Sequence, residues 1–239
     1  MKLNRWIALA GLAGLLLGAG KITQAQSLEQ RLTAEDPAGL AQTARQFGDA
    51  RRGAIIFYQP YLACRKCHLG GKMVNPLGPD LAKPTEKTTD AHIVESVLNP
   101  SKIIKKGFEP VTVVTTAGKT IVGLLVKDGK NELTLRDPAR NGLLVKIPKN
   151  KIEEQLPGRL SIMPAGQVNL LASRQQFLDL IRYLIEIRDG GAARVRELEP
   201  PPALFAARPL PEYEKHIDHA GMLSSLDQDS FKRGEAIYN

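Results

Sequence analysis

The chain contains two cysteines, and a histidine directly follows the second, in the run Cys64-Arg65-Lys66-Cys67-His68. At this spacing the two thiols can add across the vinyl groups of haem c as thioethers. The adjacent imidazole can then reach the iron as its proximal ligand. Because the 239 residues hold no other cysteine, no further thiol competes for this role. The motif predicts one covalent haem c per chain, bound by Cys64, Cys67 and His68.

Two other chemistries use the same residue types. A thioredoxin-like redox pair begins a helix after a buried strand in a βαβ unit, whereas residues 58–63, which read YQPYLA, supply no such strand. A tetrahedral zinc site needs a second ligand pair at short spacing, and His92, His216 and His219 form no such pair. Both interpretations remain alternatives to haem attachment.

The first residues have the pattern of a secretory signal peptide. Lys2 and Arg5 precede an apolar run over residues 6–19, and Thr23-Gln24-Ala25 supplies small residues for cleavage before Gln26. Residues 1–25 are therefore predicted to be a signal peptide, and the protein is expected to be periplasmic or otherwise exported. An uncleaved membrane anchor is the alternative, although the run is shorter than the roughly 20 residues that span a bilayer.

The chain is basic, but its positive charge is not concentrated. The formal charge of +8 falls to about +5 after cleavage, because residues 1–25 contain three basic residues and no acidic one. No dense stripe of lysine and arginine alternates with aromatic residues, and export argues against nucleic acid as a partner. We expect neither a nucleic-acid partner nor a stable membrane span after cleavage. Six lysines form a candidate docking face for an acidic redox partner, with ordinary solvated lysines as the alternative: Lys102, Lys105, Lys106, Lys146, Lys149 and Lys151.

A helix is predicted directly before the motif. Asp49 is a suitable N-cap for a helix over residues 50–58, in which Gly53 and Phe57 lie four residues apart on one face. A glycine on that face permits another helix to approach closely. We therefore expect a helix crossing at Gly53.

Another helix is predicted to end the same region at about residue 188. Ser173 with Gln176 forms a capping-box signature. Apolar side chains follow at helical spacing: Phe177, Leu180, Ile181, Leu184 and Ile187. Tyr183 and Leu184 are expected to cover the glycine-bearing face of the first helix.

Between these helices lie a short helix and an inserted sheet. Residues 90–99 predict a helix that ends before Pro100. Four β-branched or alternating segments follow, separated by the turn signals Ala117-Gly118, Asp128-Gly129 and Asn141-Gly142: residues 111–115, 120–126, 132–135 and 143–147. They predict a small antiparallel β-sheet inserted at about residues 108–152. Because it offers no constellation of catalytic side chains, we interpret the insertion as a docking surface.

This order of elements resembles class I c-type cytochromes. It is most similar to the haem-binding domain attached to large predicted membrane-bound dehydrogenases of Planctomycetes and Verrucomicrobia. The resemblance covers about residues 48–188 and rests on these residues: Gly53, Phe57, Cys64, Cys67, His68, Gly78-Pro79-Asp80-Leu81, Met163-Pro164, Leu180 and Tyr183-Leu184. The fold class that it implies is mainly α, a cytochrome c-like helical haem domain over residues 49–188 with an inserted small antiparallel sheet.

The resemblance also implies ligands on both sides of the iron. His68 is the expected proximal ligand, and the carbonyl of Pro79 is expected to accept its ring N–H, as metal-bound imidazoles require. Met163 lies in a turn-rich run before the last helix, where that family places its axial methionine, and is the predicted distal ligand. The inserted sheet accounts for the long interval between His68 and Met163. Ligation by His92 in place of Met163 is the alternative.

The flanking segments depart from that family. Residues 26–48, predicted as a helical leader, separate the signal peptide from the haem domain in place of a catalytic domain. A proline-rich linker is predicted over residues 189–211. Residues 212–239 are predicted to start a truncated second cytochrome domain, because residues 231–238 echo residues 51–58. A chance amphipathic helix is the alternative for this segment.

Function follows from the coordination expected at the iron. Methionine and histidine in the two axial positions leave no open site and favour one-electron transfer. We therefore expect an exported mono-haem electron-transfer protein without catalytic activity of its own, whose redox partner is a separate protein such as a dehydrogenase. One alternative is a haem c protein with an open distal site that senses a ligand or acts like a peroxidase. Another is an adhesion or assembly module whose sheet is the working part.

Overall fold

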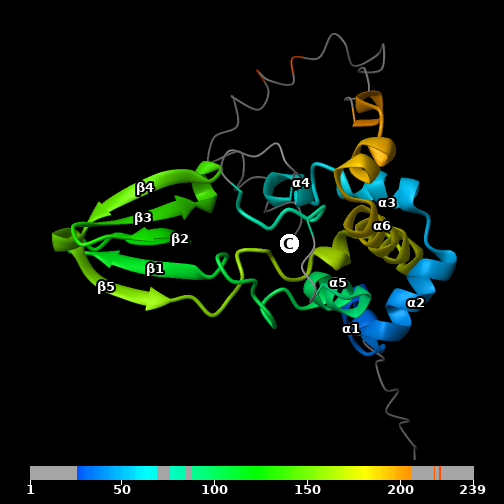
Figure 1. Cartoon of the computed structure of the whole chain (residues 1–239), viewed down its shortest axis with the longest axis horizontal. Coiled ribbons are helices and arrows are strands. Elements are labelled where there is room, and N and C mark those ends of the chain that lie inside the picture. The colour runs from blue at the N-terminus through cyan, green and yellow to red at the C-terminus, as the bar shows by residue number, and fades with distance from the viewer. Residues whose placement is uncertain (1–25, 69–75, 84–87, 206–217, 219–220, 222–239) are drawn as a thin grey trace, which may run out of the picture.

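The computed structural model describes residues 26–68, 76–83 and 88–205, together with Asp218 and Gly221. The predicted signal peptide lies outside the described residues, as do all but two residues of the predicted second cytochrome segment. The described chain has a helical part and a β-sheet part, with the turn that carries Cys64 and Cys67 between them (Figure 1).

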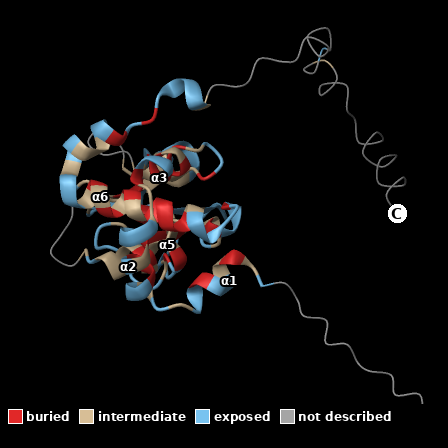
Figure 2. Cartoon of the chain, turned by 90° about the vertical axis from the view of Figure 1, so that its right-hand side faces the viewer, coloured by how far each residue is buried: buried red, intermediate tan, exposed pale blue. Residues whose placement is uncertain are grey.

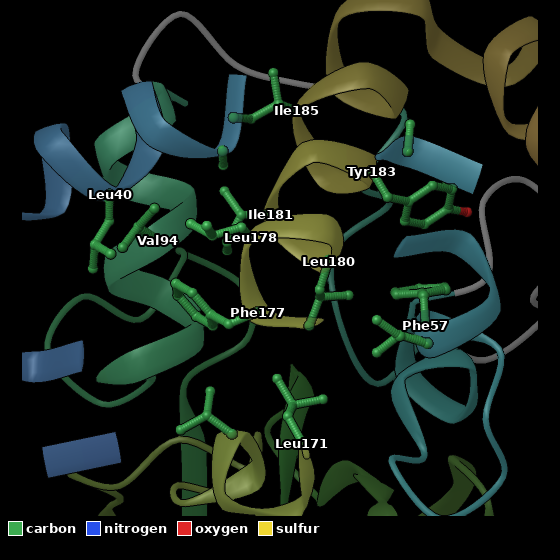
Figure 3. Close-up of a cluster of buried hydrophobic side chains, with 14 of the residues drawn as sticks. Leu40, Phe57, Val94, Leu171, Phe177, Leu178, Leu180, Ile181, Tyr183 and Ile185 are labelled. Carbon is green, nitrogen blue, oxygen red and sulfur yellow. The ribbon is translucent and has the colours of Figure 1, made fainter. Parts of the chain in front are cut away.

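The helical part is built around a single apolar core. Its elements are α1 (Leu28–Thr33), α2 (Pro37–Phe47), α3 (Ala50–Phe57), α4 (Cys64–Cys67), α5 (Asp90–Leu98) and α6 (Arg174–Leu198). Figure 2 shows buried residues gathered where α2, α3, α5 and α6 meet. Helix α6 is central, because Phe57 packs beside Tyr183 on one side of it while Leu40 and Val94 lie on the other (Figure 3).

The crossing of α3 and α6 follows from a glycine, as predicted. Asp49 caps α3 by accepting the backbone N–H of Arg52 at 2.8 Å. A Cβ on Gly53 would stand 1.9 Å from the backbone oxygen of Asp179, so only glycine permits this approach. Beside this contact the rings of Phe57 and Tyr183 lie 5.3 Å apart. The expected crossing at Gly53 is confirmed, with Tyr183 as its partner.

Helix α6 begins where the sequence predicts and continues further. The side chain of Ser173 accepts the backbone N–H of Gln176 and caps the helix. A break at Gly191, with φ 62° and ψ −155°, interrupts α6, near the predicted end at residue 188. Helical turns resume and reach Leu198, which is buried in the core. Residues 189–198 of the predicted linker over 189–211 are therefore helical, apart from the break at Gly191.

The β-sheet has five antiparallel strands in the order β4-β3-β2-β1-β5. They are β1 (Pro110–Thr115), β2 (Thr120–Asp128), β3 (Glu132–Asp137), β4 (Leu143–Pro148) and β5 (Ile152–Pro157), with 3₁₀ turns at Pro138–Arg140 and Lys149–Lys151. The first four match the predicted strands. Val113, Leu133 and Leu135 are fully buried in a core separate from that of the helices.

The prediction of a mainly α fold class is wrong. The described residues contain six helices and a five-stranded antiparallel sheet, which make a mixed α and β fold. The prediction treated the sheet as a small insertion that ends at Ile152, whereas Ile152 begins β5, which pairs with β1. The sheet also has its own buried core, so it is a structural part in its own right and not an appendage of a helical domain.

Candidate functional site

The cysteine motif forms a single helical turn between α3 and the loop that follows. The turn begins after Ala63, whose φ of 56° reverses the chain. The backbone N–H of His68 then donates to the carbonyl of Cys64 at 3.0 Å, which brings the imidazole close to the helical turn that carries both thiols. Leu62, just before the turn, is buried in the helical core. The motif is thus anchored on its N-terminal side.

The imidazole of His68 is oriented by a backbone carbonyl. Its Nδ1 lies 3.0 Å from the carbonyl oxygen of Pro79. Because a carbonyl only accepts, Nδ1 carries the proton and donates, which leaves the lone pair of the neutral ring on Nε2. Burial lowers the pKa of His68, and the hydrogen bond to Pro79 offsets only part of that effect. The ring is therefore held neutral at neutral pH, in the tautomer that a metal ligand needs.

Gly78 allows the loop to reach the imidazole. A Cβ at this position would stand 2.6 Å from Cε1 and 2.9 Å from Nδ1 of His68. The backbone N–H of Gly78 also donates to the carbonyl of Cys67 at 3.1 Å. A residue with a side chain would push the ring away from Pro79. The Gly78-Pro79 pair in the sequence therefore has a steric reason for its glycine.

Both thiols of the motif favour their protonated form. Both cysteines are free. Burial raises the pKa of Cys64 to about 11 and also raises the pKa of Cys67. A thioredoxin-like redox pair needs a thiol with a lowered pKa, since the thiolate is the nucleophile. The raised pKa values of both thiols therefore disfavour a thioredoxin-like redox pair.

One cavity brings the predicted site residues together. Its volume is about 350 Å³, and Cys64, Cys67, His68, Pro79 and Met163 all line it. Pockets that bind cofactors typically measure about 300–1,000 Å³. The rest of the wall is largely apolar and includes side chains from α5, α6 and the loop after α5: Ile93, Val97, Ile104, Phe108, Leu180 and Leu184.

The sheet contributes to the same cavity. Pro138 and Asn141, from the corner between β3 and β4, line the wall together with the loop after α5. Asn141 has φ 53° and Gly142 has φ 77°, so the turn signal Asn141-Gly142 fixes the shape of this corner. The sequence predicted the turn, but it gave no sign that the corner would close the wall of the site.

The loop that carries Met163 is held from several directions. The backbone N–H of Met163 donates to the hydroxyl of Ser161 at 3.1 Å, and the N–H of Ser161 donates to the hydroxyl of Ser101 at 3.0 Å. Gln167 donates from Nε2 to the carbonyl of Leu62 at 3.0 Å. This last bond joins the methionine loop to the segment just before Cys64. Sequence reasoning missed Gln167, because its partner lies 105 residues away and no local pattern marks the pair.

His92 remains the alternative to Met163 as the distal ligand. It lines the cavity, and its Nε2 lies 3.5 Å from the hydroxyl of Ser96, at the limit of a hydrogen bond. No group of three or more His, Cys, Asp or Glu side chains in the described ranges is arranged to hold a metal ion.

The six lysines of the candidate docking face differ in their surroundings. Lys102 pairs with Glu95, Lys146 with Glu132, and Lys149 with Asp128. Lys105 lines the cavity, as do Lys66 and Lys83. The lysines and arginines that line the cavity are therefore these three lysines and Arg188, and the lysines of the sheet are not among them.

The residues of the cavity fit a c-type haem. Two thiols stand beside a neutral imidazole, a glycine opens space for that imidazole, and a thioether lines the same cavity. Thiol, imidazole and thioether groups are those that c-type cytochromes use for attachment and axial ligation.

Comparisons with protein families and with curated proteins identify no relative of this chain, which matches no protein-family model and no curated protein. No helix in the described part of the chain is both long and apolar enough to cross a membrane. Function must therefore be inferred from the site itself.

Proposed function

We propose that this chain is an exported c-type cytochrome that transfers single electrons, with one haem attached through Cys64 and Cys67 and axial ligation by His68 and Met163. The observation that carries the proposal is the shared cavity of these four side chains, in which Pro79 orients the imidazole. The resemblance to class I c-type cytochromes supports it at the residues of the site, although the fold class is mixed.

A bound haem with histidine and methionine as axial ligands supplies one-electron chemistry and offers no open position to a substrate. Residues of the chain would orient the ligands for such a haem. Pro79 keeps the proton of His68 on Nδ1, so that Nε2 is free to bind a metal. The apolar side chains from α5 and α6 that line the cavity would limit the access of water to a bound haem, which would favour its less charged, reduced state and raise its reduction potential.

A separate redox protein is the proposed partner, and a dehydrogenase is one candidate. Lys66, Lys83 and Lys105 stand at the cavity, where they would attract an acidic surface and accelerate its association. The reaction rate with an acidic partner should therefore fall as the salt concentration rises. Electron transfer needs only approach to the haem edge, so these lysines are proposed to steer a partner and not to take part in chemistry.

The test is the optical spectrum of the oxidised protein, matured in a periplasm that contains haem-attachment machinery. We expect the weak band that marks methionine sulfur bound to ferric iron. Met163→Ala should abolish the band, whereas His92→Ala, which changes another residue of the same cavity, should retain it. A wild-type spectrum of high-spin iron would favour the open distal site of a sensor or peroxidase-like protein. A bis-histidine spectrum that depends on His92 would overturn the assignment of Met163.

A further inference from the structure

The predicted leader over residues 26–48 forms α1 and α2, which pack into the core of the helical part. Helix α1 begins with a capping box, in which Ser27 accepts the N–H of Gln30 and the side chain of Gln30 accepts the N–H of Ser27. Leu28 and Leu32 of α1 are buried in the helical core. Both the cap and the core contacts fix the position of α1, so the helix can serve as a support for neighbouring residues.

Glu29 of α1 bonds to the loop that carries Met163. The backbone N–H of Gly166 donates to Oε1 of Glu29 at 3.1 Å, and Nδ2 of Asn169 donates to Oε2 at 2.9 Å. In return the backbone N–H of Glu29 donates to Oδ1 of Asn169 at 3.0 Å. Gly166 has φ 79°, a left-handed conformation that a glycine adopts at low cost. Three hydrogen bonds therefore hold the chain just after Met163.

We infer that Glu29 is a positioning residue for the distal ligand: its carboxylate holds Gly166 and Asn169 in place, and thereby keeps Met163 within reach of the iron. This inference rests on the proposed function, in which Met163 binds the iron. It assigns the leader helix a role in ligation that neither the motif nor the resemblance assigns.

An intramolecular ligand such as Met163 is retained by the loop that carries it. A thioether on a loop competes with ligands from solution through its effective concentration, which depends on the freedom of that loop. The loop is tied on one side of Met163 through Ser161 to Ser101, and on the other through Gly166 to Glu29. Hydrogen bonds to a carboxylate are stronger than those between neutral groups. Loss of the hydrogen bonds to Glu29 should enlarge the motion of the loop and lower the effective concentration of the Met163 thioether at the iron.

The experiment is a titration of the ferric haem-loaded protein with imidazole, followed by the loss of the methionine band. We expect Glu29→Ala to bind imidazole about tenfold more tightly than wild type, a change that corresponds to about 1.4 kcal/mol. Asn169→Ala removes the other partner without altering α1 and should act in the same direction. Glu29→Gln should show a smaller effect, because its carbonyl oxygen can still accept the N–H of Gly166.

Glu35→Gln is the matched control. Glu35 also belongs to the leader, and its carboxylate accepts two hydrogen bonds from Arg174 of α6, at 2.9 and 2.6 Å. It makes no bond to the methionine loop among the described residues. This control should bind imidazole as wild type does. If Glu35→Gln tightens imidazole binding as much as Glu29→Ala, the effect is a general loosening of the leader, and the specific role of Glu29 is overturned.

Two further results separate this inference from the proposed function. If wild type shows the methionine band and Glu29→Ala binds imidazole within twofold of wild type, Glu29 is not a positioning residue although Met163 is the ligand. If wild type lacks the band and binds imidazole with the same affinity as Met163→Ala, Met163 is not the ligand. Both proposals then fail.

Discussion

Replacing Gly53 by alanine tests the closest contact in the helical core. The new Cβ would stand 1.9 Å from the carbonyl oxygen of Asp179 and 2.8 Å from the Cβ of Tyr183. Ordinary van der Waals contact begins at 3.4 Å, so α3 and α6 must separate by about 1.5 Å. The oxygen that blocks the methyl group belongs to the backbone of α6, and no change of side-chain rotamer can relieve the clash.

Two opposing effects set the change in the free energy of unfolding. Alanine favours a helix over glycine by about 0.8–1 kcal/mol. Overpacking a close contact costs typically about 1–3 kcal/mol, and more when the backbone must move. Separation would also strain the bonds that Asp179 accepts from Arg52 and from the N–H of Asp49. We expect a net loss of about 2 kcal/mol, which lowers Tm by roughly 4–8 °C in a chain of this size.

Unfolding by urea, followed by circular dichroism, measures this loss. Gly39→Ala is a control on α2, because its Cβ would approach only the side chain of Asp36, at 3.5 Å from Oδ2. That variant should keep or slightly increase the unfolding midpoint. A midpoint for Gly53→Ala equal to or above that of wild type would refute the steric account of the helix crossing.

Two further predictions concern His68 and the buried carboxylate of Asp179. Gly78→Ala should displace the imidazole from Pro79, because the new Cβ would lie 2.6 Å from Cε1 of His68; the ferric spectrum should gain high-spin character, and an unchanged spectrum would contradict the role of Gly78. Burial by itself would raise the pKa of Asp179, but the hydrogen bonds from Arg52 and Asp49 outweigh it and hold the pKa below its usual value. Because the folded-state pKa is the lower one, this stabilisation is full above about pH 4 and is lost as the pH falls through the folded-state pKa. Asp179→Asn should therefore flatten the fall in unfolding free energy between about pH 5 and pH 2, and an unchanged slope would show that Asp179 does not contribute.

The sequence predicted the elements that local chemistry determines. Asp49 and Ser173 were recognised as helix caps because their side chains bond to the backbone within three residues. The turn at Asn141-Gly142 was recognised because both residues tolerate a positive φ. Likewise Cys64, Cys67 and His68 are close in the sequence, so their shared chemistry is visible without a structure.

The fifth strand and the full extent of α6 were missed because their signals are weak. Strand β5 is an edge strand in which every residue after Ile152 is exposed, so it lacks the alternation of buried and exposed side chains that marks a strand. Its place in the sheet comes from pairing with β1, which no local pattern reveals. The linker was predicted to begin at residue 189, whereas α6 continues past the break at Gly191 and ends with Leu198 buried in the core.

The sheet contributes directly to the wall of the candidate site. Burial lowers the pKa of His68, and its imidazole lines the cavity. The helices supply only part of the wall, because Pro138 and Asn141 of the β3–β4 corner line the same cavity as His68 and Met163. A sheet that served only for docking would not need its corner at this cavity. The corner therefore makes the sheet part of the environment of the proposed haem.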